Sequence, residues 1–326
     1  MSLTYQFQTL AGSVTSPGPR YLCKTRLCQV QATPPSSVIL NADESGKFSQ
    51  KLHGSNLASG MHESAASLVS KGATVGIIGG VSVDATLKFL RKLVELSSED
   101  GGNSIPFVVC SDPWLNKELL SYDRSYFVSS TSKAESLKLD SSAIVQSLRN
   151  KRVFLENSGA RCIVMPCNVS HSWYEQVSEG CSVPFLNMAE CVAKELKDDK
   201  LKPLEAGSPR RIGVLATNAT LEAGFYNEKL QNEGFEVLVP DRATMEHTLI
   251  PAIEALSRKD MEGACNLLRI ALQVLFVRAA NSVIIASHDM QDLLPSDDPL
   301  PKKCIDPMNA LAQSTIKWIK SSGDNT

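Results

Sequence analysis

The chain has 326 residues, of which 43% are apolar and 21% are charged, and its formal net charge is −2. This composition supports a buried core and excludes a wholly disordered chain, and the length is enough for about two ordinary domains. The near-neutral charge argues against nucleic-acid binding, and the sequence has no apolar run long enough to cross a bilayer.

The N-terminal region differs in composition from the rest of the chain. No acidic residue precedes Asp43, while Arg20, Lys24 and Arg26 stand among many Ser, Thr, Pro and Gln residues. An acid-poor, Ser-rich and mildly basic start without a continuous apolar segment is typical of an organelle transit peptide. We therefore predict a transit peptide and disordered segment over residues 1–70 and a chloroplast location, or a cytoplasmic one if this segment is only a tail.

Apolar runs alternate with amphipathic stretches from Ala73 onward. Short apolar runs predict strands near residues 74–78, 105–109 and 162–165. Leucines spaced along one face from Leu87 to Leu96, and the stretch 142–157, predict helices. Strands that alternate with helices pair in parallel through right-handed crossovers, and fully apolar strands indicate a sheet covered on both faces.

The same order of elements recurs about 130 residues further along, with apolar runs at 211–217, 235–239 and 282–286. The repeat predicts an α/β fold of two pseudo-symmetric lobes, each a parallel sheet flanked by helices. Ligands of open α/β sheets bind at the carboxyl ends of the strands, so we expect the active site in the cleft between the lobes. The predicted limits are 71–188 and 189–307, with a C-terminal helix over 308–322 that packs back on the first lobe.

Two short segments follow equivalent strands of the two halves. Met165–His171 follows the third strand of the first half, and Ala286–Asp289 follows the third strand of the second. Aligning these strands puts Cys167 opposite Ser287. The nine cysteines are odd in number and form no C-x-x-C pair or zinc-like Cys/His spacing, which indicates free thiols and no metal site. A free cysteine is often simply buried, but a position just past a strand end favours a functional role for Cys167.

Several segments together resemble motifs of the aspartate/glutamate racemase family over about residues 73–320. They are Gly76–Gly80 with Ala85 and Thr86, Ser111–Pro113, Met165–His171, and Gly213–Thr217 with Thr220 and Tyr226. The resemblance is to a divergent member, similar to plastid-targeted plant homologues. It implies a homodimeric, cofactor-independent racemase or isomerase of small carboxylates, such as the amino acids aspartate and glutamate, with no nucleic-acid or membrane partner.

In this family, two cysteines face the substrate α-carbon from opposite sides, and Cys167 matches the first of them. One thiolate removes the α-proton, and the other thiol returns a proton to the far face. The resemblance places substrate-binding groups at Asn168, Ser111, Thr217, Ser170, His171 and Gly80. His171 has a second interpretation, as a structural histidine at a helix start whose ring nitrogens form hydrogen bonds within the protein.

The sequence departs from the family at the second catalytic cysteine, where Ser287 stands, and Val169 replaces a carboxylate-binding threonine. Ser287 or His288 is then the candidate for the second face. Alternatively, Ser287 is a small polar wall and the His288 ring points away. A single working cysteine also fits a decarboxylase or a cis–trans isomerase of the same fold. A third interpretation is a non-catalytic, ligand-binding pseudoenzyme.

Overall fold

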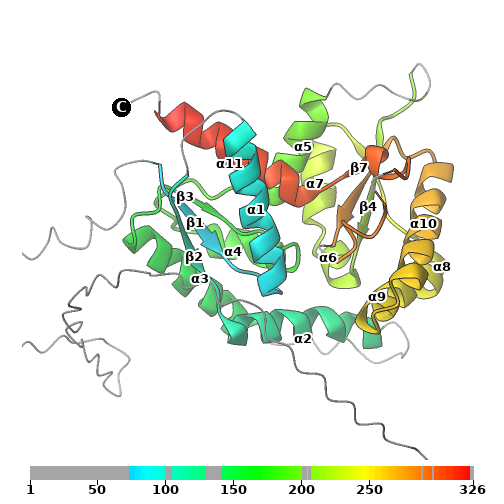
Figure 1. Cartoon of the computed structure of the whole chain (residues 1–326), viewed down its shortest axis with the longest axis horizontal. Coiled ribbons are helices and arrows are strands. Elements are labelled where there is room, and N and C mark those ends of the chain that lie inside the picture. Colours follow the sequence, from blue (N-terminus) through cyan, green and yellow to red (C-terminus); the bar gives the residue numbers. More distant parts are fainter. Residues whose placement is uncertain are drawn as a thin grey trace, which may run out of the picture. The chain divides into compact units, whose positions relative to one another are not determined.

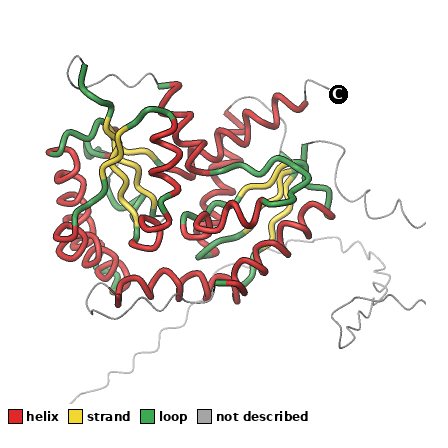
Figure 2. The backbone as a smooth tube through the Cα atoms, turned by 180° about the vertical axis from the view of Figure 1, so that it is seen from behind, coloured by secondary structure: helices red, strands yellow, loops and turns green. Residues whose placement is uncertain are grey.

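The computed structural model describes residues 73–99, 105–129, 141–199, 204, 207–287, 289–295 and 297–323. The predicted transit peptide over residues 1–70 and the site candidate His288 lie outside the described residues. The described residues form an α/β fold with two lobes, each built on a parallel sheet flanked by helices, as the sequence predicts (Figures 1 and 2).

The first sheet has the strand order β2-β1-β3, and all its strands are parallel. Its strands are β1 (Val75–Ile78), β2 (Phe107–Cys110) and β3 (Cys162–Val164). The helices of this lobe are α1 (Val83–Glu99), α2 (Pro113–Ser129), α3 (Ser142–Asn157), the 3-10 helix η1 (Val169–Trp173) and α4 (Tyr174–Ser178). Every residue of β1 is buried, as expected for a central strand covered on both faces.

The second sheet has the order β5-β4-β6-β7, again with parallel pairs. Its strands are β4 (Arg211–Ala216), β5 (Glu236–Leu238), β6 (Ser282–Ala286) and β7 (Cys304–Ile305). The helical segments around it are α5 (Met188–Asp198), α6 (Asn218–Ala223), α7 (Phe225–Asn232), α8 (Arg242–Thr244), the π-helix η2 (Met245–Leu249), α9 (Ile250–Ser257), α10 (Met261–Val277), the 3-10 helix η3 (Pro301–Lys303) and α11 (Pro307–Gly323).

The two sheets repeat one another strand by strand. In each sheet the first strand of the lobe, β1 or β4, lies between the second and third strands. In the first lobe Phe185 forms an isolated parallel bridge with Ile163, at the position where β7 pairs with β6 in the second lobe. The segments 183–189 (VPFLNMA) and 304–310 (CIDPMNA), which are similar in sequence, therefore pair at the same edge of each sheet.

Short polar side chains fix where the helices begin after the strands. The Ser82 hydroxyl accepts a hydrogen bond of 3.0 Å from the Ala85 N–H at the start of α1. Asp112 accepts one of 3.0 Å from Trp114 N–H at the start of α2. These caps satisfy backbone donors that the first turn of a helix leaves unpaired. They thereby fix the turns that follow β1 and β2.

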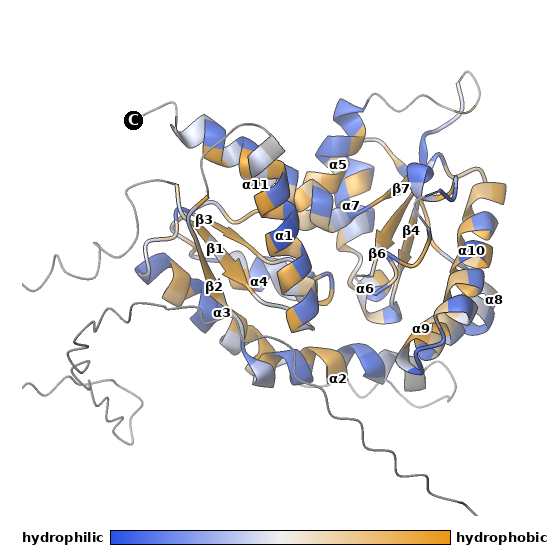
Figure 3. Cartoon of the chain, viewed as in Figure 1, coloured by the Kyte–Doolittle hydropathy of each residue, from blue (hydrophilic) through white to orange (hydrophobic). Residues whose placement is uncertain are grey.

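The hydrophobic core is shared between the lobes. One buried cluster combines residues of β1 and β4 with apolar faces of α1, α5, α7 and α11. A second cluster fills the outer face of the first sheet and a third that of the second sheet. The strands are mostly apolar, and the helices are amphipathic, with one apolar and one polar face (Figure 3). The predicted limits of the two lobes, 71–188 and 189–307, and of the C-terminal helix, 308–322, stay predictions. Across the described ranges, each helix is too short or too polar to span a bilayer.

Candidate active site

A cavity of about 420 Å³ lies between the lobes at the carboxyl ends of the strands. The first lobe contributes residues from the turns after β1 and β3 and from α1 and α2, and the second lobe contributes residues after β4 and β6 and from α9. Cys167, Asn168, Thr217 and Ser287 all line this cavity. Its volume is in the range of sites that bind small molecules.

Cys167 lies on the first-lobe wall, two residues past the end of the predicted third strand, and is 3% exposed. Its Sγ atom accepts hydrogen bonds from the backbone N–H groups of Val81 (3.4 Å) and Ser170 (3.5 Å). Burial raises the pKa of the thiol above its ordinary value, while these two N–H donors lower it and the carboxylate of Asp123 adds to the rise. The resting state is therefore a thiol, with donors already placed to stabilise a thiolate.

Gly79 and Gly80 let the turn after β1 approach the catalytic candidate closely. A Cβ atom on Gly80 would lie 2.6 Å from Cys167 Sγ and still closer to its Cβ. A Cβ atom on Gly79 would lie 2.9 Å from the Ser111 hydroxyl. Any side chain at Gly80 would thus displace Cys167. The structure places Gly80 against the thiol, and its carbonyl accepts a hydrogen bond from Asn116.

Both ring nitrogens of His171 are engaged by the backbone, and the residue does not line the cavity. Nε2 accepts a hydrogen bond of 3.0 Å from Met188 N–H, so Nδ1 carries the proton and donates to the Cys167 carbonyl at 2.9 Å. Burial lowers the pKa of the ring to about 4. The neutral ring stacks on Tyr174 at 5.7 Å between centroids. This geometry is that of a residue that positions the Cys167 backbone.

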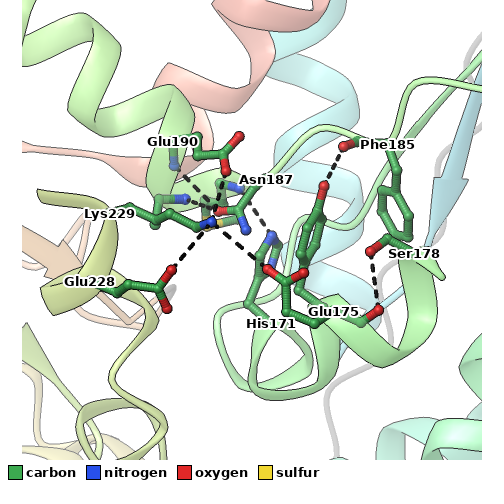
Figure 4. A network of polar contacts seen from close by, with 11 residues as sticks. His171, Glu175, Ser178, Phe185, Asn187, Glu190, Glu228 and Lys229 are labelled. Carbon is green, nitrogen blue, oxygen red and sulfur yellow. Dashed lines mark hydrogen bonds and ion pairs between the residues drawn. The ribbon is translucent and has the colours of Figure 1, made fainter. Parts of the chain in front are cut away.

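The surroundings of His171 also join the two lobes (Figure 4). Lys229 of α7 forms ion pairs with Glu190 of α5 at 3.0 Å and with Glu175 of α4 at 3.8 Å. Side-chain hydrogen bonds to Glu190 raise the pKa of this lysine above its ordinary value, so it stays charged. The backbone segment that carries Cys167 and His171 therefore lies beside the ion pairs through which Lys229 links the two lobes.

Asn168 is oriented by a residue of the other lobe. The Tyr226 hydroxyl donates a hydrogen bond of 2.7 Å to Asn168 Oδ1, and both side chains are buried. Because its oxygen is occupied, the carboxamide faces a ligand as an N–H donor. Burial raises the pKa of Tyr226 well above its ordinary value, so the phenol remains a donor. The sequence places Tyr226 in a family-like motif without indicating its partner, although a buried tyrosine usually needs a polar one.

Thr217 also forms a bond between the lobes. Its hydroxyl donates a hydrogen bond of 2.6 Å to Asp123 Oδ1, which comes from the middle of α2. Asp123 is 9% exposed and lines the cavity. Asp123 could not be identified from the sequence, because it belongs to no motif. It stands out only in the fold, where it lies next to Thr217.

Ser287 lies on the second-lobe wall of the same cavity, directly after β6, and Asp289 lines it as well. Ser111 and Ser170 do not line the cavity. Ser111 is exposed after β2, and Ser170 is fully buried and contributes its backbone N–H to Cys167. The cationic side chains of Lys88 and Arg124 also line the cavity. In the part of the chain that the structure describes, no group of three His, Cys, Asp or Glu side chains is arranged to hold a metal ion.

Solved structures with the same fold come from racemases and their homologues. An aspartate racemase homologue from Pyrococcus horikoshii OT3 matches with a TM-score of 0.59 and 20% identity, covering 76% of this chain and 99% of that chain. The aspartate racemase of Picrophilus torridus matches with a TM-score of 0.55 and 25% identity, covering 76% and 95%. The fold is therefore that of the two-lobed α/β racemases.

The chain belongs to the Asp/Glu/Hydantoin racemase family, whose model matches residues 78–315. Among curated proteins, it is 24% identical over 252 residues to the broad specificity amino-acid racemase RacX of Bacillus subtilis (strain 168). That alignment covers 74% of this chain and 96% of RacX. The family membership supports isomerase activity in general.

Proposed function

We propose that the protein is a cofactor-independent racemase or isomerase of small carboxylates, acting on amino acids such as aspartate or glutamate by α-proton transfer through Cys167. One observation carries the proposal: Cys167 and Ser287 line one cavity from opposite lobes. An α-carbon bound between them would present one face to each lobe. Membership in the racemase family supports the same reaction class.

In the proposed reaction the Cys167 thiolate takes the α-proton, and the electron pair of the C–H bond is delocalised into the substrate carboxylate. N–H and O–H donors near that carboxylate stabilise the charge as it develops. Asn168 lines the cavity, and its carboxamide N–H group is the donor we favour. The Thr217 hydroxyl lines the cavity as well, but it gives its proton to Asp123 and is left as an acceptor. Ser170, His171 and Gly80 support the Cys167 loop, and Ser111 lies against Gly79. A proton returns to the opposite face from the second lobe, through Ser287 or His288.

A second candidate function follows from the thiol content of the site. Cys167 is the one cysteine among the described residues that line the cavity. A single thiol suits one-sided chemistry, in which Cys167 protonates an enediolate after decarboxylation or adds to a double bond during cis–trans isomerisation. Such an enzyme would deliver a proton to one face only and would not racemise its substrate.

Exchange of the α-proton tests both candidates. The full chain would be incubated in D2O with L- and D-aspartate, glutamate and a set of neutral amino acids, beside a Cys167→Ala control. NMR would follow loss of the α-proton signal, and chiral chromatography would follow the enantiomers. Exchange with inversion that the control lacks supports the racemase. Exchange without inversion supports the one-sided enzyme, and no exchange on any amino acid contradicts the racemase.

We also propose plastid import and assembly as a homodimer. The acid-poor N-terminal composition supports the first, and the resemblance to the family supports the second. Fluorescence of a fusion carrying residues 1–70 checks import, with diffuse cytoplasmic signal as the contrary result. Light scattering on the purified chain checks assembly, and a monomeric mass at micromolar concentration contradicts it.

A further inference from the structure

The side chain of Ser170 is enclosed in the protein next to Cys167 and does not line the cavity. Ser170 is fully buried, and among the described residues its hydroxyl has no hydrogen-bond partner. Buried polar groups in native proteins are nearly always hydrogen-bonded, so an isolated hydroxyl in such a place calls for an explanation. Because Ser170 has no exposed surface, the protein atoms around the hydroxyl decide what it can bond to.

The course of the chain directs this hydroxyl toward the Cys167 sulfur. Ser170 follows Cys167 by three residues, at the start of η1, and one turn of a 3-10 helix brings residues with this spacing over one another. The backbone N–H of Ser170 already donates to Cys167 Sγ at 3.5 Å. The hydroxyl belongs to the same short side chain, so one serine can present both donors to a single acceptor.

A thiol is a poor partner for this hydroxyl, whereas a thiolate is a good one. A neutral sulfur is a weak hydrogen-bond acceptor, and hydrogen bonds to an ionised group are shorter and stronger. Burial raises the pKa of Cys167, and the Ser170 hydroxyl is the first of the groups that lower it, ahead of the N–H groups of Ser170 and Val81. The hydroxyl is therefore near enough to the sulfur to respond when the thiol loses its proton.

We propose that Ser170 is a positioning residue, whose hydroxyl turns to donate a hydrogen bond to the Cys167 sulfur when that sulfur is a thiolate. The hydroxyl proton stays on its oxygen, and the thiol proton leaves to solvent through the cavity. Together with the N–H groups of Val81 and Ser170, the thiolate then has three donors. The inference rests on the proposed function in that the thiolate is the form that takes the α-proton.

The role that we propose for Ser170 predicts opposite effects on stability and on ionisation. A buried hydroxyl without a partner destabilises the resting protein, so its removal should leave the melting temperature unchanged or raise it. The same removal should make the thiolate of Cys167 rarer. A serine with a purely structural role would instead lower the melting temperature when it is replaced.

The test is the pH dependence of Cys167 labelling by iodoacetamide in the full chain without substrate, followed by mass spectrometry. Ser170→Ala removes only the hydroxyl. Because a hydrogen bond to a charged group is lost, we expect labelling near neutral pH to fall roughly 10- to 100-fold. The difference should shrink toward alkaline pH, where the thiolate becomes the main form in both proteins. A change in access alone would lower the rate by the same factor at every pH.

Two further variants make the result specific to the Ser170 hydroxyl. Ser170→Thr keeps a hydroxyl at this position and should restore labelling toward that of the wild type. Ser172→Ala removes the other hydroxyl of η1 that is buried without a partner among the described residues, and its pH profile should match the wild type. The charged side chains that line the cavity are the same in all these proteins: Lys88, Asp123, Arg124 and Asp289.

The inference is overturned if Ser170→Ala keeps the labelling profile of the wild type or if Ser172→Ala shows the same shift. A lower melting temperature in Ser170→Ala also overturns it, since the hydroxyl would then have a partner in the resting protein. Labelling needs no substrate, so these outcomes do not depend on turnover. Exchange of the α-proton together with an unshifted profile in Ser170→Ala contradicts only the role of Ser170. A shifted profile in a protein that shows no exchange contradicts only the proposed catalysis.

Discussion

Tyr226 of the second lobe donates a hydrogen bond of 2.7 Å to Asn168 of the first, next to the cysteine on which the proposed chemistry depends. Changing Tyr226 to Phe leaves a buried carboxamide oxygen without its donor, which destabilises a protein by about 1–3 kcal/mol. It also frees the carboxamide to rotate. We expect both a lower melting temperature and weaker ligand binding.

Tyr174→Phe is the matched control for Tyr226→Phe. The Tyr174 hydroxyl donates to the Phe185 carbonyl, and Tyr174 does not line the cavity. This control should lower stability and leave ligand affinity unchanged. Equal losses of affinity in the two variants would show that the Asn168 contact has no particular role in binding.

Gly80→Ala should disable the site through sterics alone. The added methyl group would lie 2.6 Å from Cys167 Sγ, so the thiol must move, and overpacking of this kind destabilises by about 1–3 kcal/mol. The rate at which iodoacetamide labels Cys167, followed by mass spectrometry, reports the displacement. Gly207→Ala is the control, because a Cβ there meets no atom within 4 Å and the substitution strains only the local backbone. Unchanged labelling in Gly80→Ala would contradict the close approach.

Cys167 should react as a thiol with a raised pKa. Because burial raises the pKa, the fraction of thiolate stays low near neutral pH and grows tenfold with each pH unit until the pKa is reached. In free protein, labelling of Cys167 should therefore continue to accelerate at pH values where an ordinary cysteine has levelled off. A labelling rate that is already constant above neutral pH would show that the N–H groups of Val81 and Ser170 outweigh burial.

His171 should make stability depend on pH. Its pKa is about 4 in the folded protein and about 6.5 in an unfolded chain, so the unfolded state binds more protons between these values. The contribution is fully present above about pH 6.5 and is lost as the pH falls toward 4, on the order of 3 kcal/mol in all. His171→Gln removes the titration, so the difference in unfolding free energy between wild type and variant should shrink as the pH falls across this window.

The comparison with the variant is needed because Glu195 titrates in the same range. Burial raises the pKa of Glu195 to about 7, so its effect on stability has the opposite slope and the total curve mixes the two. A constant difference between wild type and His171→Gln from pH 4 to 7 would contradict the buried neutral ring.

A cysteine at the position of Ser287 should favour inversion if that position faces the substrate. Ser287→Cys places a second thiol on the second-lobe wall, and a thiol is a far better acid and base than a hydroxyl near neutral pH. On any amino acid that undergoes exchange, we expect the ratio of inversion to exchange to rise. Ser257→Cys, on the cavity wall from α9, should leave this ratio unchanged. Equal ratios in both variants would show that Ser287 does not face the α-carbon.

Regular local patterns were enough to predict the sheets. The apolar run at Ser282–Ala286 is β6 to the residue, and the stretch 142–157 is α3, because burial on both faces of a strand and on one face of a helix leaves a direct periodic signal. β7 has only two residues, and so short a strand leaves no periodic signal by which to predict it. Helix α2 was not predicted, since its apolar and polar residues are less clearly separated.

In the candidate site, too, the residues at strand ends could be predicted, and those defined by contacts with distant parts of the chain could not. Cys167 and Ser287 were identified because strand ends are fixed positions in an α/β fold, and both line the cavity. Asp123 and Tyr226 act through partners 94 and 58 residues away, and no local pattern encodes such a contact. His171 was expected near the ligand, but its ring orientation depends on the Met188 backbone, which only the folded chain brings close.

The C-terminal helix α11 packs against α1, the first helix of the described fold, and against α5 (Figure 1). The residues of α11 follow those of α1 by more than 200 positions, so most of the second lobe lies between them in the sequence. The face of α1 that contacts α11 therefore stays uncovered until the second lobe has been synthesised. A nascent first lobe would expose this face for that interval, and its packing is completed only together with the second lobe.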